Sequence, residues 1–142
     1  LLAAERGTEV RLLTDPESPD HRNLITIRGT LADGSRVSVS GTLIGITQKE
    51  RLVEVNNFVV DLEPTEHLAF FTYEDRPGMV GTVGKILGDA GVNIAGMQVS
   101  RAEKGGQALV ALSVDSAVPV DVLEDIRGSI NADIVRGVNL SD

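Results

Sequence analysis

The residues from Tyr73 to Met79, in the order Tyr-Glu-Asp-Arg-Pro-Gly-Met, form the chain's best candidate for binding chemistry. Asp75 supplies a carboxylate that suits a ligand ammonium group. Pro77 fixes its own φ angle and Gly78 permits an otherwise strained backbone, so the chain can turn here into a predicted helix. The free N–H groups at that helix start, near Gly78 and Met79, carry a partial positive charge and can bind a ligand carboxylate. The run therefore predicts a small site for a zwitterion.

Asn93 is a second candidate contact, because its amide can donate and accept hydrogen bonds where a strand is expected to open after the turn at Gly91. A different interpretation requires no ligand. In that interpretation Asp75 caps the helix and Asn93 only fits the turn. The sequence pattern alone leaves both interpretations open.

No residues are spaced for catalysis. No serine stands in a nucleophile elbow, the chain has no cysteine, and no glycine-rich dinucleotide fingerprint is present. Gly81, Gly84 and Gly88 fall inside the predicted helix rather than in a turn, and they indicate close packing there. We therefore predict no catalytic residue, no metal ligand and no cofactor site in this chain.

The composition of the chain argues against several classes of partner. The chain has 142 residues, enough for one ordinary domain or two small ones, and no cysteine for a thiolate metal site. A net charge of −8 repels phosphate backbones and 3% aromatic residues offer little base stacking, so we expect no nucleic-acid partner. No apolar run approaches the roughly 20 residues of a membrane span and no signal peptide is evident. We expect a cytoplasmic protein without a membrane partner.

The second part of the chain, residues 65–142, predicts an α+β domain with the ferredoxin-like order βαββαβ. Apolar strands alternate with two segments that carry apolar residues at helical spacing. The expected elements are a strand at 67–73, a helix at 79–90, strands at 92–101 and 107–114, a helix from 119 and a strand at 134–140.

The first part, residues 1–64, predicts a mostly β region of short strands. Asp33-Gly34 and Asn56-Asn57 are signals for tight hairpins, because glycine and asparagine tolerate a positive φ. The opening residues Leu1–Gly7 are typical of a helix end, so we expect a piece of a longer polypeptide. The expected strands lie at 8–13, 23–31, 36–44, 51–55 and 58–62.

Two motifs at this spacing make residues 66–140 resemble an ACT domain. They are Asp75-Arg76-Pro77-Gly78 and, after the helix, Ala90-Gly91-Val92-Asn93-Ile94. The ACT domain is a small βαββαβ regulatory module of amino-acid metabolism. The resemblance therefore implies an allosteric, amino-acid-binding role for the second part of the chain.

The first part resembles the intervening domain of long-form D-3-phosphoglycerate dehydrogenases, in Asp20-His21-Arg22-Asn23, the Asp33-Gly34 hairpin, Val39-Ser40-Gly41-Thr42-Leu43 and the Asn56-Asn57 strand pair. In those enzymes this domain lies between the catalytic core and a C-terminal ACT domain. The resemblance implies that residues 1–64 are the end of an intervening domain. It also implies a parent oxidoreductase that uses NAD, with catalytic and nucleotide-binding domains upstream, in L-serine biosynthesis.

The same resemblance assigns an effector site for L-serine, the feedback inhibitor of such enzymes. Its contacts fall on Tyr73, Asp75 and Asn93, with the helix-start amides near Gly78 and Met79 completing the pocket. ACT domains of this family pair side by side and bind serine between two copies. A homo-oligomer formed through the ACT domains is therefore implied.

The resemblance also implies an anion site in the intervening domain, because some long-form enzymes bind a phosphate-bearing ligand there. The candidate cations are His21, Arg22, Arg28, Lys49 and Arg51. The alternative is a solvated basic rim on an acidic protein, with no ligand.

Two other functions remain open at this point. One is the regulatory part of an iron–sulfur L-serine dehydratase, whose cluster cysteines would lie outside this sequence. The other is a stand-alone ACT module that binds a different amino acid.

Overall fold

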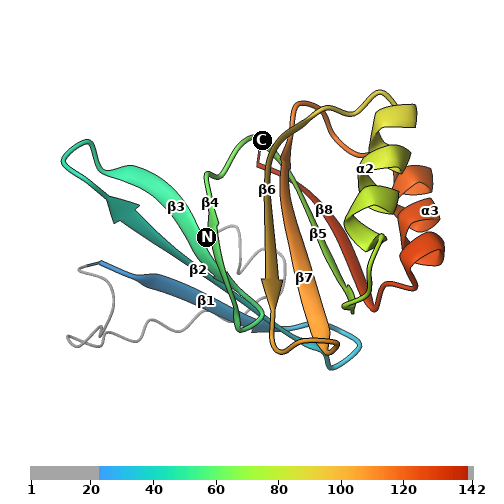
Figure 1. Ribbon diagram of the computed structural model, residues 1–142. Coiled ribbons are helices and arrows are strands. Elements are labelled where there is room, and N and C mark those ends of the chain that lie inside the picture. The colour runs from blue at the N-terminus through green and yellow to red at the C-terminus, as the bar shows by residue number, and fades with distance from the viewer. Residues whose placement is uncertain (1–22, 141–142) are drawn as a thin grey trace.

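The computed structural model describes residues 23–140, which form two four-stranded antiparallel sheets, with two helices on one face of the second sheet (Figure 1). The first sheet has the strand order β1-β2-β3-β4. Its strands are β1 (Ile25–Thr30), β2 (Arg36–Ile44), β3 (Lys49–Val55) and β4 (Phe58–Leu62). The strand expected at 8–13 lies outside the described residues.

Two hairpins of the first sheet form where the sequence predicted them. Gly34 has a φ of 83°, which closes the connection between β1 and β2. In the same turn, hydrogen bonds from Ser35 lower the pKa of the Asp33 carboxyl. Asn56 and Asn57, with φ of 49° and 68°, connect β3 and β4. Two successive positive φ angles match the twist of a hairpin, so the asparagine pair fixes this turn.

The second sheet has the strand order β6-β7-β5-β8, and its chain order is βαββαβ. This is the ferredoxin-like α+β arrangement, and the prediction is confirmed with element bounds within two residues of those expected. The elements are β5 (His67–Glu74), α2 (Met79–Asp89), β6 (Ile94–Arg101), β7 (Gln107–Val114), α3 (Val120–Ile130) and β8 (Ile134–Asn139).

Glycines define both ends of α2. Gly78 precedes the helix with a φ of 88°, and Gly91 follows it with a φ of 73°. Both angles lie in the left-handed region that favours glycine. The three glycines within or at the end of the helix do not follow the prediction of close packing. A Cβ atom built at Gly81, Gly84 or Gly88 would meet no atom within 4 Å outside the local helix backbone. These glycines face open space.

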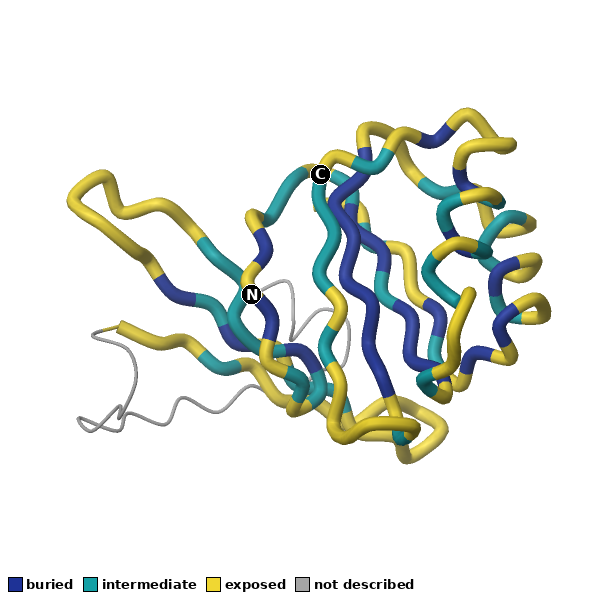
Figure 2. The backbone as a smooth tube through the Cα atoms, viewed as in Figure 1, coloured by how far each residue is buried: buried dark blue, intermediate teal, exposed yellow. Residues whose placement is uncertain are grey.

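The main core lies between the second sheet and its helices (Figure 2). Central strands β5 and β7 supply fully buried residues such as Phe71 and Leu112, and Val83, Leu87 and Ile126 come from the helices. The opposite face of this sheet needs a second cover, because its residues are also apolar.

Part of that cover comes from the first sheet rather than from a second copy of the chain. Val55, Val60 and Leu62 pack in one buried cluster with Leu68 and Leu109 of the second sheet. Figure 1 shows β4 beside β6 at this junction. The first sheet is thus anchored through β3 and β4, while β1 and β2 extend away.

Candidate functional site

The turn between β5 and α2 is fastened to the neighbouring hairpin. The backbone N–H of Asp75 donates to the carbonyl oxygen of Gly106, at 2.8 Å, in the connection between β6 and β7. The N–H of Ala102 donates to the carbonyl of Gln107 at 3.0 Å and closes that connection. Asp75 is therefore held next to the end of β6, although 26 residues of sequence separate it from Arg101.

An ion pair joins these two residues. Nη1 of Arg101 donates to Oδ2 of Asp75 at 3.2 Å, and the two side chains are 55% and 20% exposed. Among the described residues, no side-chain hydrogen bond caps α2 at Gly78. The interpretation that Asp75 only caps the helix is therefore wrong, because its carboxylate pairs with an arginine across the turn.

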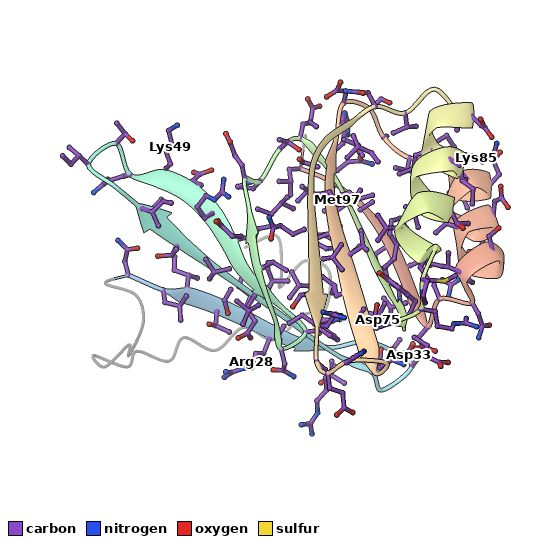
Figure 3. All side chains as sticks on the ribbon, in the orientation of Figure 1. Arg28, Asp33, Lys49, Asp75, Lys85 and Met97 are labelled. Atoms are coloured by element: carbon purple, nitrogen blue, oxygen red, sulfur yellow. The ribbon has the colours of Figure 1, made fainter. Side chains whose placement is uncertain are left out.

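A hollow of about 360 Å³ lies over this ion pair. Three of its lining side chains are cationic and one is anionic, in a chain whose net charge is −8. Such a hollow favours a ligand with a negative group that meets the arginines and a positive group that meets the carboxylate. Figure 3 shows Asp75 at the end of the second sheet where this hollow lies. The lining residues are Asp75, Arg76, Pro77, Arg101, Lys104 and Gly105.

Tyr73 lies beneath the hollow rather than on its surface. It is 1% exposed and belongs to the core between the second sheet and the helices. Burial raises the pKa of its phenol, and the nearby carboxylate of Asp75 raises this pKa further. The ring is thus a core residue, and only its hydroxyl end is available to influence a ligand near Asp75.

Gly78 and Met79 lie at the helix start, as predicted. Met79 is the first residue of α2, and Gly78 accepts the N–H and hydroxyl hydrogen bonds of Thr82 at 2.9 and 3.0 Å. The first turn contains no acidic side chain. Its N–H groups and positive dipole end therefore face the same turn as Asp75.

Asn93 lies at the other end of β6. Its Nδ2 donates to Oδ2 of Asp115 at 2.7 Å, and its carbonyl accepts the N–H of Asp115 at 3.0 Å. Eight residues along an extended strand separate Asn93 from Arg101, a distance of about 25 Å. A single chain therefore brings Tyr73, Asp75, Gly78 and Met79 together, but not Asn93.

The candidate cations of the anion site do not lie together in the described part of the first sheet. Nε of Arg51 pairs with Oδ1 of Asp61 at 2.6 Å, and its Nη2 donates to the Asp61 carbonyl. Arg28 lies opposite Ser38 and Lys49 opposite Ile44, six residues apart on β2.

Those six residues of strand span about 20 Å. Figure 3 shows Arg28 and Lys49 at different ends of the sheet. His21 and Arg22 lie outside the described residues, so the anion site stays a prediction.

Sequence reasoning missed Arg101 and Lys104. The only available signal was one basic residue just before the turn that precedes Gln107 and another within that turn, and turns commonly carry basic residues on the surface. Two further findings concern residues 23–140 alone. They contain no grouping of three potential metal ligands, and no helix among them is long and apolar enough to cross a membrane.

The fold and the site define the class of the second part of the chain. Residues 67–130 match the family model of the ACT domain, so this part of the chain is an ACT domain. The resemblance seen in the two turn motifs is thereby confirmed.

Over nearly its whole length the chain is similar to D-3-phosphoglycerate dehydrogenases. It is 39% identical over 140 residues to the enzyme of Mycobacterium leprae, a match that covers 99% of this chain and 26% of that enzyme. The enzyme of Bacillus subtilis is 38% identical over 125 residues, with 88% of this chain and 23% of the enzyme covered. That of Methanocaldococcus jannaschii is 38% identical over 109 residues, covering 77% and 20%. The chain thus spans about a quarter of the length of these relatives.

Proposed function

We propose that this chain is the C-terminal regulatory part of an NAD-dependent D-3-phosphoglycerate dehydrogenase. Residues 1–64 would be the end of the intervening domain and residues 65–142 the ACT domain. The similarity to D-3-phosphoglycerate dehydrogenases supports this parent enzyme over an L-serine dehydratase. The chain itself binds L-serine as a feedback effector, and the upstream catalytic domains of the same cytoplasmic polypeptide bind NAD and substrate.

The observation that carries the proposal is the paired charge at the β5–α2 turn. An α-amino acid presents an ammonium group and a carboxylate on one carbon. Asp75 suits the ammonium group, while Arg101 and the first N–H groups of α2 suit the carboxylate. Serine is small enough for a hollow of about 360 Å³ that is open to solvent.

The position of Asn93 supports a site made by two copies of the chain. β6 is an edge strand of the second sheet, and Asp75 and Asn93 lie near its opposite ends. If two β6 strands pair antiparallel about a two-fold axis, the end that holds Asn93 in one copy meets the end that holds Asp75 in the other. Two equivalent sites then form, each with both residues.

Calorimetric titration of the chain with L-serine tests the proposal, with D-serine, glycine and inorganic phosphate as separate titrants. We expect one L-serine per chain, weaker binding of the other amino acids, and a loss of L-serine binding in Asp75→Ala. Asp89→Ala is the matched control, since Asp89 is another carboxylate that pairs with a cation, Lys85, and it lies at the far end of α2. Saturating ligand should raise the free energy of unfolding by about 2.7 kcal/mol at a hundredfold excess over Kd.

Mixing two variants tests the shared site. Asp75→Ala and Asn93→Ala each damage both sites of a pair. A mixed pair regains one intact site, because the Asn93→Ala copy supplies Asp75 and the Asp75→Ala copy supplies Asn93. Recovery of about half a site per mixed chain is the expected result. If mixing restores nothing while mixed pairs form, the site does not lie between two copies.

A further inference from the structure

We propose that Arg101 is a specificity-determining residue of the effector site, and that its guanidinium recognises the carboxylate of the amino acid. This inference rests on the proposed function and extends it to the class of ligand. The site would select small zwitterions with a free carboxylate, and it would reject amines of the same size that lack one.

The first step is the place of Arg101 in the sheet. It is the last residue of β6 and lies opposite Ala108, which in turn lies opposite Tyr73 on β5. Residues directly opposite one another in adjacent strands point to the same face, so these three form one row on the helix-covered side. The small side chain of Ala108 separates Tyr73 from Arg101 and leaves room above the row.

The second step is the contact with Asp75. The ion pair uses Nη1 of Arg101, and a guanidinium carries five N–H donors in a planar fork. The remaining donors can bind a second carboxylate while Asp75 keeps the arginine in position. The carboxylate of Asp75 likewise has capacity beyond one hydrogen bond, so it can accept a ligand ammonium group at the same time.

The third step is the small contribution that the ion pair between Asp75 and Arg101 makes to stability before a ligand binds. Arg101 is 55% exposed, and exposed ion pairs contribute about 0–1 kcal/mol. Rearrangement of the pair around a ligand therefore costs little. The backbone beneath it does not have to move, because the hydrogen bond from Asp75 to Gly106 already fixes the turn against the β6–β7 connection.

Lys104 provides a control that distinguishes recognition of a carboxylate by a planar guanidinium from general attraction to a positive charge. It lines the same hollow and carries the same charge as Arg101, but the contact with the Asp75 carboxylate is made by Arg101. An ammonium group also lacks the planar fork that binds a carboxylate through two parallel hydrogen bonds. Removal of Lys104 changes the electrostatic potential in the hollow to a similar degree and leaves the fork intact.

The experiment compares L-serine with L-serinamide, which keeps the ammonium and hydroxyl groups and replaces the carboxylate with a neutral amide. Calorimetry would give the Kd of both ligands for the wild-type chain, Arg101→Gln, Arg101→Lys and Lys104→Gln. Loss of a charge-assisted hydrogen bond corresponds to a change of about tenfold to a hundredfold. We expect wild type to prefer L-serine by at least that factor.

The expected pattern is specific. Arg101→Gln should lose most of the preference, mainly through weaker L-serine binding, and Arg101→Lys should recover only part of it. Lys104→Gln should keep the preference. If Arg101→Gln discriminates as well as wild type, or if Lys104→Gln loses as much as Arg101→Gln, the assignment of Arg101 is wrong. If the wild-type chain binds neither ligand, the proposed function itself fails, and this inference fails with it.

Discussion

The two sheets differ sharply in how far they bury their apolar residues. Phe71 and Leu112 in the second sheet are 0% exposed, whereas Ile25 and Ile27 in β1 are 74% and 70% exposed. Figure 2 shows the same contrast, with dark central strands beside the helices and exposed segments along β1. Exposed apolar residues gathered on one strand are uncommon on a free surface and typical of surfaces that contact something else.

The difference has a structural reason. The ACT domain covers one face of its sheet with its own two helices, so that face is closed without outside help. Among residues 23–140 no helix packs on the first sheet. Its buried apolar contacts with the second sheet come from β3 and β4. Most of the buried core and the proposed effector site therefore belong to the second sheet, and the first sheet is attached to it through a small shared cluster.

The largest expected effect tests this contrast directly. Leu112→Ala should lower the free energy of unfolding by about 2–5 kcal/mol, because it removes buried methyl groups from a packed core. Ile27→Ala, a truncation of similar size on β1, should change it by less than about 0.5 kcal/mol. Urea unfolding of both variants measures the difference. Equal losses would show that β1 is buried in solution.

A smaller effect is expected from two glycines with nearly the same backbone angle. Gly78 has a φ of 88° and Gly34 a φ of 83°, and a Cβ atom at either would meet no atom within 4 Å. Alanine in this region costs about 1–2 kcal/mol of backbone strain. At Gly78 we expect the full cost, since the hydrogen bond from Asp75 to Gly106 holds this turn against the second sheet.

At Gly34 we expect a smaller loss, because the exposed hairpin can open locally without unfolding the second sheet. Thermal unfolding of Gly78→Ala and Gly34→Ala compares the two turns. A greater loss at Gly34 would contradict the view that the first sheet is the less cooperative part.

A third prediction is that one substitution raises the free energy of unfolding. Gly84→Ala should stabilise the chain by about 0.5–1 kcal/mol, because alanine is the better helix former and open space surrounds this position. Thermal unfolding at several chain concentrations would measure it. Destabilisation that grows with chain concentration would instead place α2 against another copy of the chain, which would restore the close packing that the sequence suggested.

Much of this architecture could be predicted from sequence, because local physics determines it. Gly91 ends α2, the asparagine pair at 56–57 forms a tight hairpin, and helical spacing identifies α2 and α3. Each of these signals lies within a few residues of the structure it determines. Element bounds were therefore accurate, including those of β2, β4 and β7.

The arrangement of the site was harder to predict, because it depends on contacts between distant residues. Arg101 meets Asp75 only because β6 returns to the turn where α2 began. The same return places Asn93 at the far end of the strand, although it is closer to Asp75 in sequence than Arg101 is. The burial of Tyr73 follows from which side chains of β5 face the helices, and a mostly apolar strand such as β5 does not reveal this.

The smallest effect at neutral pH, where it is absent, concerns Tyr73 and the pH dependence of stability. Burial, and then the Asp75 carboxylate, raise the pKa of its phenol above the usual 10.0. Below pH 10 both the folded and the unfolded chain keep this proton, so Tyr73 adds no pH dependence. As the pH rises above 10 the unfolded chain releases the proton first, and the free energy of unfolding falls by up to about 1.4 kcal/mol per pH unit until the folded chain also ionises.

Because Tyr73 is the only tyrosine of the chain, its ionisation can be followed directly by phenolate absorbance. Unfolding between pH 8 and 11 should show a steeper alkaline loss for wild type than for Tyr73→Phe, which keeps the ring and removes the titrating group. Asp75→Asn should lower the phenol pKa, since it removes the nearby negative charge. If the phenolate forms at its ordinary pH in the folded wild-type chain, Tyr73 is more exposed in solution, and its ring would then be a candidate ligand contact of the hollow after all.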